Sequence, residues 1–235
     1  MAKVIILSGA GISAESGIRT FRDNDGLWKE YKVAELCSIS SLKINRNATL
    51  DFYDYRRIEL KNKYPNYAHS EIVKIKQKYP QDITLITQNV DNLFEKAGIK
   101  QDEIIHLHGY LRNIKCSRVK CTYKIDIGYE HLNKDSVCPL CKKKLRPDIV
   151  FFGEIAPNYE KLYKSFKDCE FFVVIGTSGY VINPNIFLDK KIKYSILNNL
   201  YPSEAIDARF YSKVLYKNAT EAIDEIIKDI ELFLK

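Results

Sequence analysis

Four cysteines in two close pairs have the spacing of a metal site. Cys116 and Cys121 form one pair, Cys138 and Cys141 form the other, and 16 residues separate the two pairs. Two such pairs on short turns can bring four thiolates to one tetrahedral Zn²⁺. Because all four ligands come from the protein, we expect this zinc to be structural. The polar, lysine-rich surroundings offer little apolar core, so the metal would stabilise this region.

A zinc ribbon that binds nucleic acid without catalysis is an alternative of a different class. Lys142–Lys144 would suit it, but lysines are also ordinary on the exposed face of a small ribbon. Only Tyr123 and Tyr129 are available to stack on bases in this region. We therefore expect no specific nucleic-acid partner.

A glycine turn near the start of the chain could hold phosphate groups. The aliphatic run at 4–7 predicts a strand buried on both faces, and Gly9, Gly11 and Ala14 follow it in the pattern G-x-G-x-x-A. Glycines in such a turn let the backbone approach a pyrophosphate, and the helix beyond presents free N–H groups. The acidic residue that a dehydrogenase carries about 20 positions later is missing, because residues 19–28 are polar and loop-like. The turn alone leaves open whether a dinucleotide binds here.

Polar side chains also follow two later apolar strands, at 83–87 and 171–175. Open α/β sheets place their ligand groups at such strand ends. Asn89 and Asp91 could equally cap the N-terminus of a helix. The small residues after the second strand are suited to contacts with ribose or phosphate. The residues concerned are Gln88, Asn89, Val90 and Asp91 after the first strand, and Gly176, Thr177 and Ser178 after the second.

His108 is a candidate general base. It follows a short apolar run at 103–105 and precedes Gly109. A histidine at a strand end can exchange protons near neutral pH. However, His106 and His108 alternate, and such histidines can also be buried partners or metal ligands.

The elements that position these residues alternate between strand and helix. Besides the strands above, 193–197 predicts a strand, and apolar spacing predicts helices at 34–36, 48–60, 69–75 and 220–234. This order predicts an α/β fold: a doubly wound, mostly parallel Rossmann-like sheet with a smaller helical and zinc-ribbon domain formed by insertions. We expect residues 1–30, 80–110 and 146–235 in the Rossmann-like domain, 31–79 in the helical insertion and 111–145 in the ribbon.

Composition narrows the class of protein. The 235 residues are 46% hydrophobic, which suffices for one large core with a small appended domain. We expect a cytoplasmic protein that does not contact membranes, because no apolar run approaches the ~20 residues of a span and no secretory signal is evident. The net charge of +7 is spread along the chain and fits an acidic ligand. Six cysteines in such a chain favour metal ligands or free thiols over disulfides.

Taken together, these motifs resemble the sirtuins, which are NAD-dependent protein-lysine deacylases. The matching pieces occur in family order over almost the whole chain. They are Gly9–Ser13, Gly17–Ile18 with Phe21–Arg22, Gln88–Asp91, Leu107–Gly109, the four cysteines, Phe152–Glu154, Gly176–Ser178 and Asn199–Leu200. Two positions depart from the common pattern. Arg19–Thr20 replaces a frequent Pro-Asp, as in the bacterial branch that removes acidic acyl groups, and Asn218 replaces a late glycine.

The resemblance implies roles for individual residues. NAD would be the co-substrate, with His108 as general base and Phe21–Arg22 on a loop that closes over the cofactor. In the desuccinylase and demalonylase branch, a tyrosine and an arginine three residues later bind the acyl carboxylate, which here are Tyr53 and Arg56. The NAD contacts would be Gly9, Ala10, Gly11, Ile12, Ser13, Phe21, Arg22, Trp28, Gln88, Asn89, Val90, Asp91, Gly176, Thr177, Ser178, Asn199, Leu200, Tyr201 and Ala219.

Two more residues near this pair carry expectations. Cys37 stands where that branch tends to have a small alanine, so its thiol would narrow the acyl pocket. Arg57 lies about 100° round the helix from Arg56 and should matter little to acyl recognition.

The implied function is removal of succinyl, malonyl and acetyl groups from lysine, which releases nicotinamide and 2′-O-acyl-ADP-ribose. The partners would be acylated lysine side chains of protein substrates, and we expect a monomer. An NAD-dependent mono-ADP-ribosyltransferase is the alternative, since it cleaves the same bond of NAD.

Overall fold

The aliphatic run after Lys3 forms the centre of a parallel sheet. The computed structural model describes residues 3–20 and 33–235. Strand β1 (Val4–Ser8) is buried along its whole length and pairs in parallel with β2 (Ile83–Thr87) and β7 (Phe171–Ile175). The sheet is completed in parallel by β3 (Ile104–His106), β8 (Tyr194–Asn199) and β9 (Lys213–Tyr216), in the order β3-β2-β1-β7-β8-β9. The predicted doubly wound sheet is confirmed.

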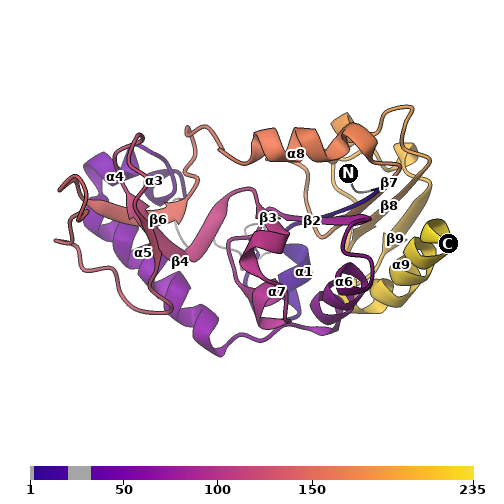
Figure 1. Cartoon of the computed structure of the whole chain (residues 1–235), viewed down its shortest axis with the longest axis horizontal. Coiled ribbons are helices and arrows are strands. Elements are labelled where there is room, and N and C mark those ends of the chain that lie inside the picture. Colours follow the sequence, from indigo (N-terminus) through magenta and orange to yellow (C-terminus); the bar gives the residue numbers. More distant parts are fainter. Residues whose placement is uncertain (1–2, 21–32) are drawn as a thin grey trace.

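Helices cover both faces of this sheet (Figure 1). On one face, α6 (Tyr67–Lys78), α7 (Leu93–Lys96) and α9 (Ala219–Leu234) contribute to a single apolar cluster with β1, β2 and β7. On the other face, α8 (Tyr159–Ser165) packs through Leu162 against a second cluster. The sheet is therefore buried on both sides, as its uninterrupted aliphatic strands require.

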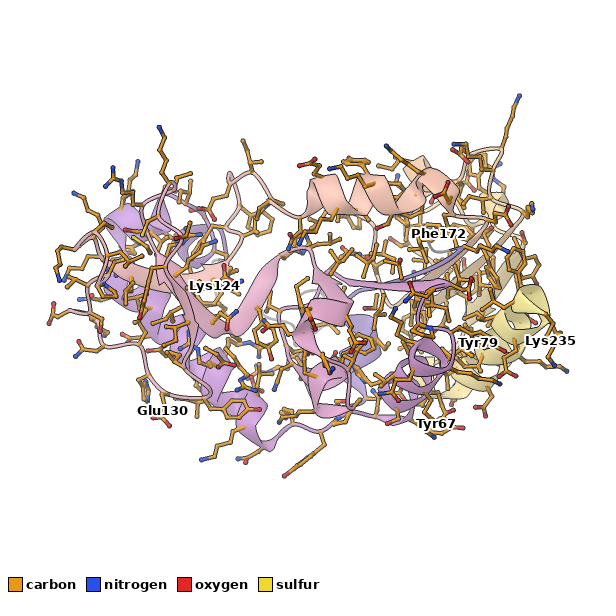
Figure 2. All side chains as sticks on the ribbon, in the orientation of Figure 1. Tyr67, Tyr79, Lys124, Glu130, Phe172 and Lys235 are labelled. Carbon is orange, nitrogen blue, oxygen red and sulfur yellow. The ribbon has the colours of Figure 1, made fainter. Side chains whose placement is uncertain are left out.

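A smaller part of the molecule lies beyond one end of the sheet (Figure 1). It contains α3 (Val33–Leu36), α4 (Ser41–Ile44), α5 (Arg46–Glu59) and a three-stranded antiparallel sheet. That sheet is formed by β5 (Lys124–Asp126), β4 (Gly109–Cys116) and β6 (Leu145–Ile149). In Figure 2, Lys124 and Glu130 mark this smaller part and Phe172 marks the larger one.

A buried ion pair ties α5 to the small sheet. Arg57 is fully buried and donates to Asp54, to the Leu111 carbonyl (2.7 Å) and to the Glu130 carbonyl (3.2 Å). Asp54 also accepts from the backbone N–H of Leu132 (3.0 Å). Three separate segments therefore meet on one guanidinium–carboxylate pair.

The remaining described elements are short. None of the described helices is long and apolar enough to cross a membrane. The short elements are α1 (Gly11–Ala14), η1 (Leu60–Asn62), η2 (Gln101–Glu103), η3 (Phe166–Asp168), η4 (Pro184–Phe187) and η5 (Ala208–Phe210).

Candidate active site

Two glycine turns meet at the point where the order of the strands in the sheet reverses. The chain continues from β1 to β2 on one side, whereas β7 leads to β8 on the other, so the crevice between β1 and β7 is the switch point of the sheet. A Cβ on Gly9 would lie 2.7 Å from the Gly176 carbonyl oxygen, and a Cβ on Gly11 would lie 2.7 Å from the Gly176 Cα. Gly176 itself has a φ of +66°. The glycines are thus required for contact between the turns, a reason that differs from the expected approach to a phosphate.

A cavity of about 710 Å³ opens at this switch point. It is large enough for a sizeable organic ligand. Most of the predicted site residues line it: Gly9, Ala10, Gly11, Ser13, Tyr53, Arg56, Gln88, Asn89, Val90, Asp91, His108, Gly176, Thr177, Ser178, Asn199, Leu200 and Tyr201.

Among the predicted contacts that the structure describes, two do not line the cavity. Ile12 is fully buried in the apolar cluster on the α6 and α9 face, and Ala219 is the first residue of α9 in the same cluster. Phe21, Arg22 and Trp28 lie outside the described residues.

The end of β2 and the first glycine turn share a hydrogen-bond network. Asn89 Nδ2 donates to the Gly9 carbonyl (3.1 Å) and to Ser13 Oγ (3.1 Å), and Ser13 Oγ donates to Asp91 Oδ2 (2.9 Å). The other Asp91 oxygen accepts from the N–H of Leu93 (3.1 Å), the first residue of α7, although the N-cap of that helix is Asn92. Burial raises the pKa of Asp91, while the Leu93 and Ser13 bonds oppose this shift. The predicted N-cap role for Asn89 or Asp91 is therefore wrong, because Asn92 occupies that position, and the ligand role of Asp91 stays a prediction.

His69 also belongs to this network, although no motif or spacing pointed to it. It lies on α6, and its Nε2 is 3.4 Å from Ser13 Oγ. Burial lowers the pKa of His69 to about 3, so the ring is neutral at physiological pH. Its position next to Ser13 depends on the packing of α6 against the sheet, which short-range spacing does not encode.

The tautomer of His108 is fixed by the backbone. Nδ1 lies 2.9 Å from the Gln88 carbonyl, which can only accept, so Nδ1 carries the proton and Nε2 carries the lone pair. Nε2 lies 3.2 Å from the Tyr159 hydroxyl at the start of α8, and burial raises the pKa of Tyr159, which keeps it a donor. Burial also lowers the pKa of His108. The imidazole is therefore neutral and able to accept a proton at Nε2 at neutral pH.

The turn after β7 is held from two sides. Gln88 Nε2 donates to Thr177 Oγ1 (3.1 Å), and Asn199 Nδ2 donates to the Thr177 carbonyl (2.9 Å). Polar groups from the ends of β2, β7 and β8 are thus fixed around one part of the cavity.

The far part of the cavity is formed by α5 and neighbouring loops. Tyr53 is buried, packs edge-on against Phe151 at 5.3 Å, and hydrogen-bonds with the Cys37 thiol. Burial raises the pKa of Tyr53 well above its ordinary value and also raises that of Cys37. Both groups are therefore neutral at physiological pH.

Arg56 has a partner that the sequence analysis did not include. Its Nη1 lies 2.6 Å from Glu59 Oε2, one helical turn further along α5. Arg57 does not line the cavity and belongs instead to the buried pair with Asp54. Arg56 and Arg57 thus lie on different faces of α5, as their spacing predicts, and the small effect of Arg57 on acyl recognition stays a prediction.

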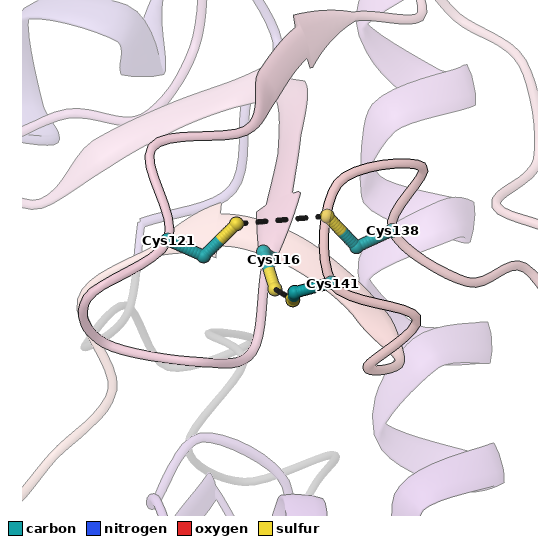
Figure 3. Close-up of side chains that lie close together, drawn as sticks. All are labelled: Cys116, Cys121, Cys138 and Cys141. Carbon is teal, nitrogen blue, oxygen red and sulfur yellow. Dashed lines mark hydrogen bonds between the residues drawn. The ribbon is translucent and has the colours of Figure 1, made fainter.

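The four cysteines gather at one point of the small sheet (Figure 3). All four Sγ atoms lie within 4.8 Å of one another, with Cys116 3.4 Å from Cys141 and Cys121 3.6 Å from Cys138. A zinc ion with bonds of 2.3 Å needs sulfur atoms about 3.8 Å apart, so the thiols fit one tetrahedral metal. None of the four lines the 710 Å³ cavity, which agrees with a structural role.

The fold is a parallel sheet with a ligand cavity at its switch point, a glycine turn at that cavity and an inserted four-cysteine module. These features define a class of dinucleotide-binding α/β proteins. The chain belongs to the Sir2 family, whose model matches residues 9–183. The predicted sirtuin resemblance is confirmed.

Similar proteins agree with this assignment. An NAD-dependent protein deacylase of Campylobacter jejuni (strain RM1221) is 46% identical over 236 residues, which cover 100% of this chain and 98% of the relative. An NAD-dependent protein deacylase of Helicobacter hepaticus is 40% identical, with 99% of each chain covered. Among solved structures, a Sir2 homologue in complex with NAD superposes with a TM-score of 0.83 at 30% identity, covering 99% of this chain and 90% of the other.

Proposed function

We propose that this protein is an NAD-dependent protein-lysine deacylase that transfers the acyl group to ADP-ribose and releases nicotinamide. The observation that carries the proposal is a single cavity lined by both glycine turns, by His108 and by the Tyr53–Arg56 pair. Such a cavity can hold a dinucleotide and an acylated side chain together. The names of the relatives support the same activity.

The proposed reaction depends on positioning. When NAD is bound, it supplies the nicotinamide leaving group and the ribose that receives the acyl group. Cleavage builds positive charge on the ribose, and the weakly nucleophilic amide oxygen of the acyl-lysine can capture it only if both are held in line. We assign Asn89 and Asp91 to the nicotinamide and its ribose, because their side chains are fixed at the cavity wall by the network with Ser13.

His108 is proposed to take the proton of a ribose hydroxyl, whose oxygen then attacks the captured acyl group. Its Nε2 lone pair faces the Tyr159 hydroxyl, so that hydroxyl must move aside for the ribose or pass the proton on. The bond from the acyl carbon to the lysine nitrogen then breaks, the amine leaves, and a water molecule adds to the acyl carbon, which gives 2′-O-acyl-ADP-ribose and free lysine. A general base of this kind contributes about 10²–10⁴-fold to the rate.

The remaining NAD contacts follow the family pattern. Gly9–Ser13, Gly176–Ser178 and Asn199–Tyr201 are proposed to hold the phosphates and the adenosine. Phe21, Arg22 and Trp28 are proposed to cover the cofactor. Ala219 is kept as a candidate adenine contact only by resemblance.

The acyl group is proposed to lie beside Tyr53 and Arg56, with Cys37 narrowing the pocket. A succinyl or malonyl carboxylate can accept a charge-assisted bond from Arg56 and a neutral bond from Tyr53. Both donors line the cavity, which supports acidic acyl groups as substrates besides acetyl.

The test is a mass-spectrometric assay of acetyl-, succinyl- and malonyl-lysine peptides with NAD. We expect deacylated peptide, nicotinamide and 2′-O-acyl-ADP-ribose, and loss of these products in His108→Asn. His131→Asn, which changes an exposed histidine outside the cavity, is the matched control. ADP-ribose attached to protein, with no deacylated peptide, would replace the proposal by a mono-ADP-ribosyltransferase.

Location and assembly remain proposals. We infer a cytoplasmic location because none of the six cysteines, all of which are described by the structure, forms a disulfide, as is usual in a reducing compartment. We also propose that the protein is a monomer and that it has the three domain ranges expected from the sequence.

A further inference from the structure

A carboxylate lies behind the arginine at the proposed acyl end of the cavity. Arg56 and Glu59 lie three positions apart near the end of α5, with Nη1 2.6 Å from Oε2. Their side chains are only 12% and 19% exposed, so the pair is partly shielded from solvent. Arg56 lines the cavity and Glu59 does not, so the carboxylate meets the guanidinium from outside the cavity wall.

The second donor of the pocket is also engaged. The Tyr53 hydroxyl hydrogen-bonds with the Cys37 thiol, which lines the same cavity. A pocket that held an unpaired guanidinium and phenol would resist a neutral acyl group, because burying unpaired donors is unfavourable. Here neither donor lacks a partner before substrate binds. Acetyl-lysine in this pocket would therefore leave neither Arg56 nor Tyr53 without a partner.

We propose that Glu59 is a specificity-determining residue: an internal counter-charge that lets one pocket accept both neutral and acidic acyl groups. This inference rests on the deacylase function proposed above. With acetyl-lysine in the cavity, Arg56 keeps Glu59 as its partner, and no guanidinium is left unpaired. With succinyl- or malonyl-lysine, the carboxylate binds Arg56 from the cavity side and shares it with Glu59.

Sharing limits the preference for acidic substrates. Two carboxylates on one guanidinium repel each other, and this repulsion falls only on the acidic acyl group. Conversely, removal of the Glu59 charge would leave Arg56 unpaired whenever acetyl-lysine binds. Glu59 thus acts on the two substrate classes in opposite directions.

The experiment compares kcat/KM for succinyl- and acetyl-lysine peptides in wild type and Glu59→Gln. The amide keeps the shape of the carboxylate and removes its charge. We expect the succinyl-to-acetyl ratio to rise about tenfold, the order expected for one like charge in a partly screened site. Thermal melting of each variant confirms that the fold is retained.

Glu71→Gln is the matched control. Glu71 pairs with Lys74 three positions along α6, its side chain is 18% exposed, and it does not line the cavity. Its variant should leave the substrate ratio unchanged.

The outcomes separate this inference from the function on which it rests. A ratio within twofold of wild type in folded Glu59→Gln, or an equal fall for both substrates, would overturn the role of Glu59 while deacylation stands. If wild type deacylates neither peptide, the proposed function itself fails.

Discussion

Replacement of Arg57 by methionine should destabilise the protein far more than the same change at its neighbour Arg56. The variant loses the bonds to Leu111 and Glu130 and leaves Asp54 as a buried carboxylate without its counter-charge. Breaking one partner of a buried pair typically reduces the free energy of unfolding by about 3–5 kcal/mol. Nη2 of Arg57 is buried and has no hydrogen-bond partner among the described residues. We therefore expect the loss in the free energy of unfolding to lie at the lower end of this range, about 3 kcal/mol.

Urea unfolding followed by circular dichroism would measure this loss, and thermal melting should show a decrease of about 6–12 °C. Arg56→Met breaks an i,i+3 pair near the surface and should lose less than about 1 kcal/mol. The double variant Arg57→Met with Asp54→Leu removes both charges, so it should lose less than the sum of the single changes. The reasoning is refuted if Arg57→Met unfolds within about 1 kcal/mol of wild type, or if the two arginine variants are equally stable.

The other predictions concern metal, proton transfer and acyl recognition. Cys138→Ala should abolish stoichiometric zinc in elemental analysis and unfold the small sheet while the large sheet stays partly folded; full zinc content and unchanged stability would contradict the site. In a profile of kcat/KM against pH, the midpoint of the acid limb should lie below about pH 6.5. The reason is that burial lowers the pKa of His108, which acts as a base in its neutral form. In Tyr159→Phe that midpoint should move to higher pH, since a donor that stabilises the neutral imidazole is lost; no movement would show that the hydroxyl has no effect on the base. Arg56→Met should reduce desuccinylation tens- to thousands-fold while acetyl-lysine turnover is retained, and Tyr53→Phe should act in the same direction more weakly; equal losses for both substrates would make the pair structural.

The sheet and the metal site were predictable because their signals are local. Strands buried on both faces, such as β1 and β7, consist of uninterrupted apolar residues, and four cysteines at short spacings identify a metal site without knowledge of the fold. The edge strand β9 was not predicted, because its four residues are half-buried or exposed and include a lysine at the start. The two polar strand ends were identified since parallel strands bring their carboxyl ends to one edge.

The groups that modify the site could not be predicted, because they approach from distant elements or depend on side-chain conformation. Tyr159 reaches His108 from 51 positions further along the chain. Glu59 is near Arg56 in sequence, but only the folded helix shows that its carboxylate turns toward the guanidinium. The resemblance assigned residues to the substrate, and the structure identified the hydrogen-bond and ion-pair partners of those residues.

The contact between the two glycine turns also limits how this protein can change. A Cβ on Gly9 or Gly11 would clash with Gly176, and a Cβ on Gly176 would lie 2.5 Å from the Ile12 nitrogen. The atoms nearest to a Cβ at these three glycines are backbone atoms or a Cβ. A smaller side chain at a neighbouring position therefore cannot make room for the added Cβ. In a saturation-mutagenesis screen, we expect these three positions to reject every residue, alanine included, with no second-site suppressor among the neighbouring side chains. Variation that alters cofactor affinity would have to arise at residues further along the cavity wall.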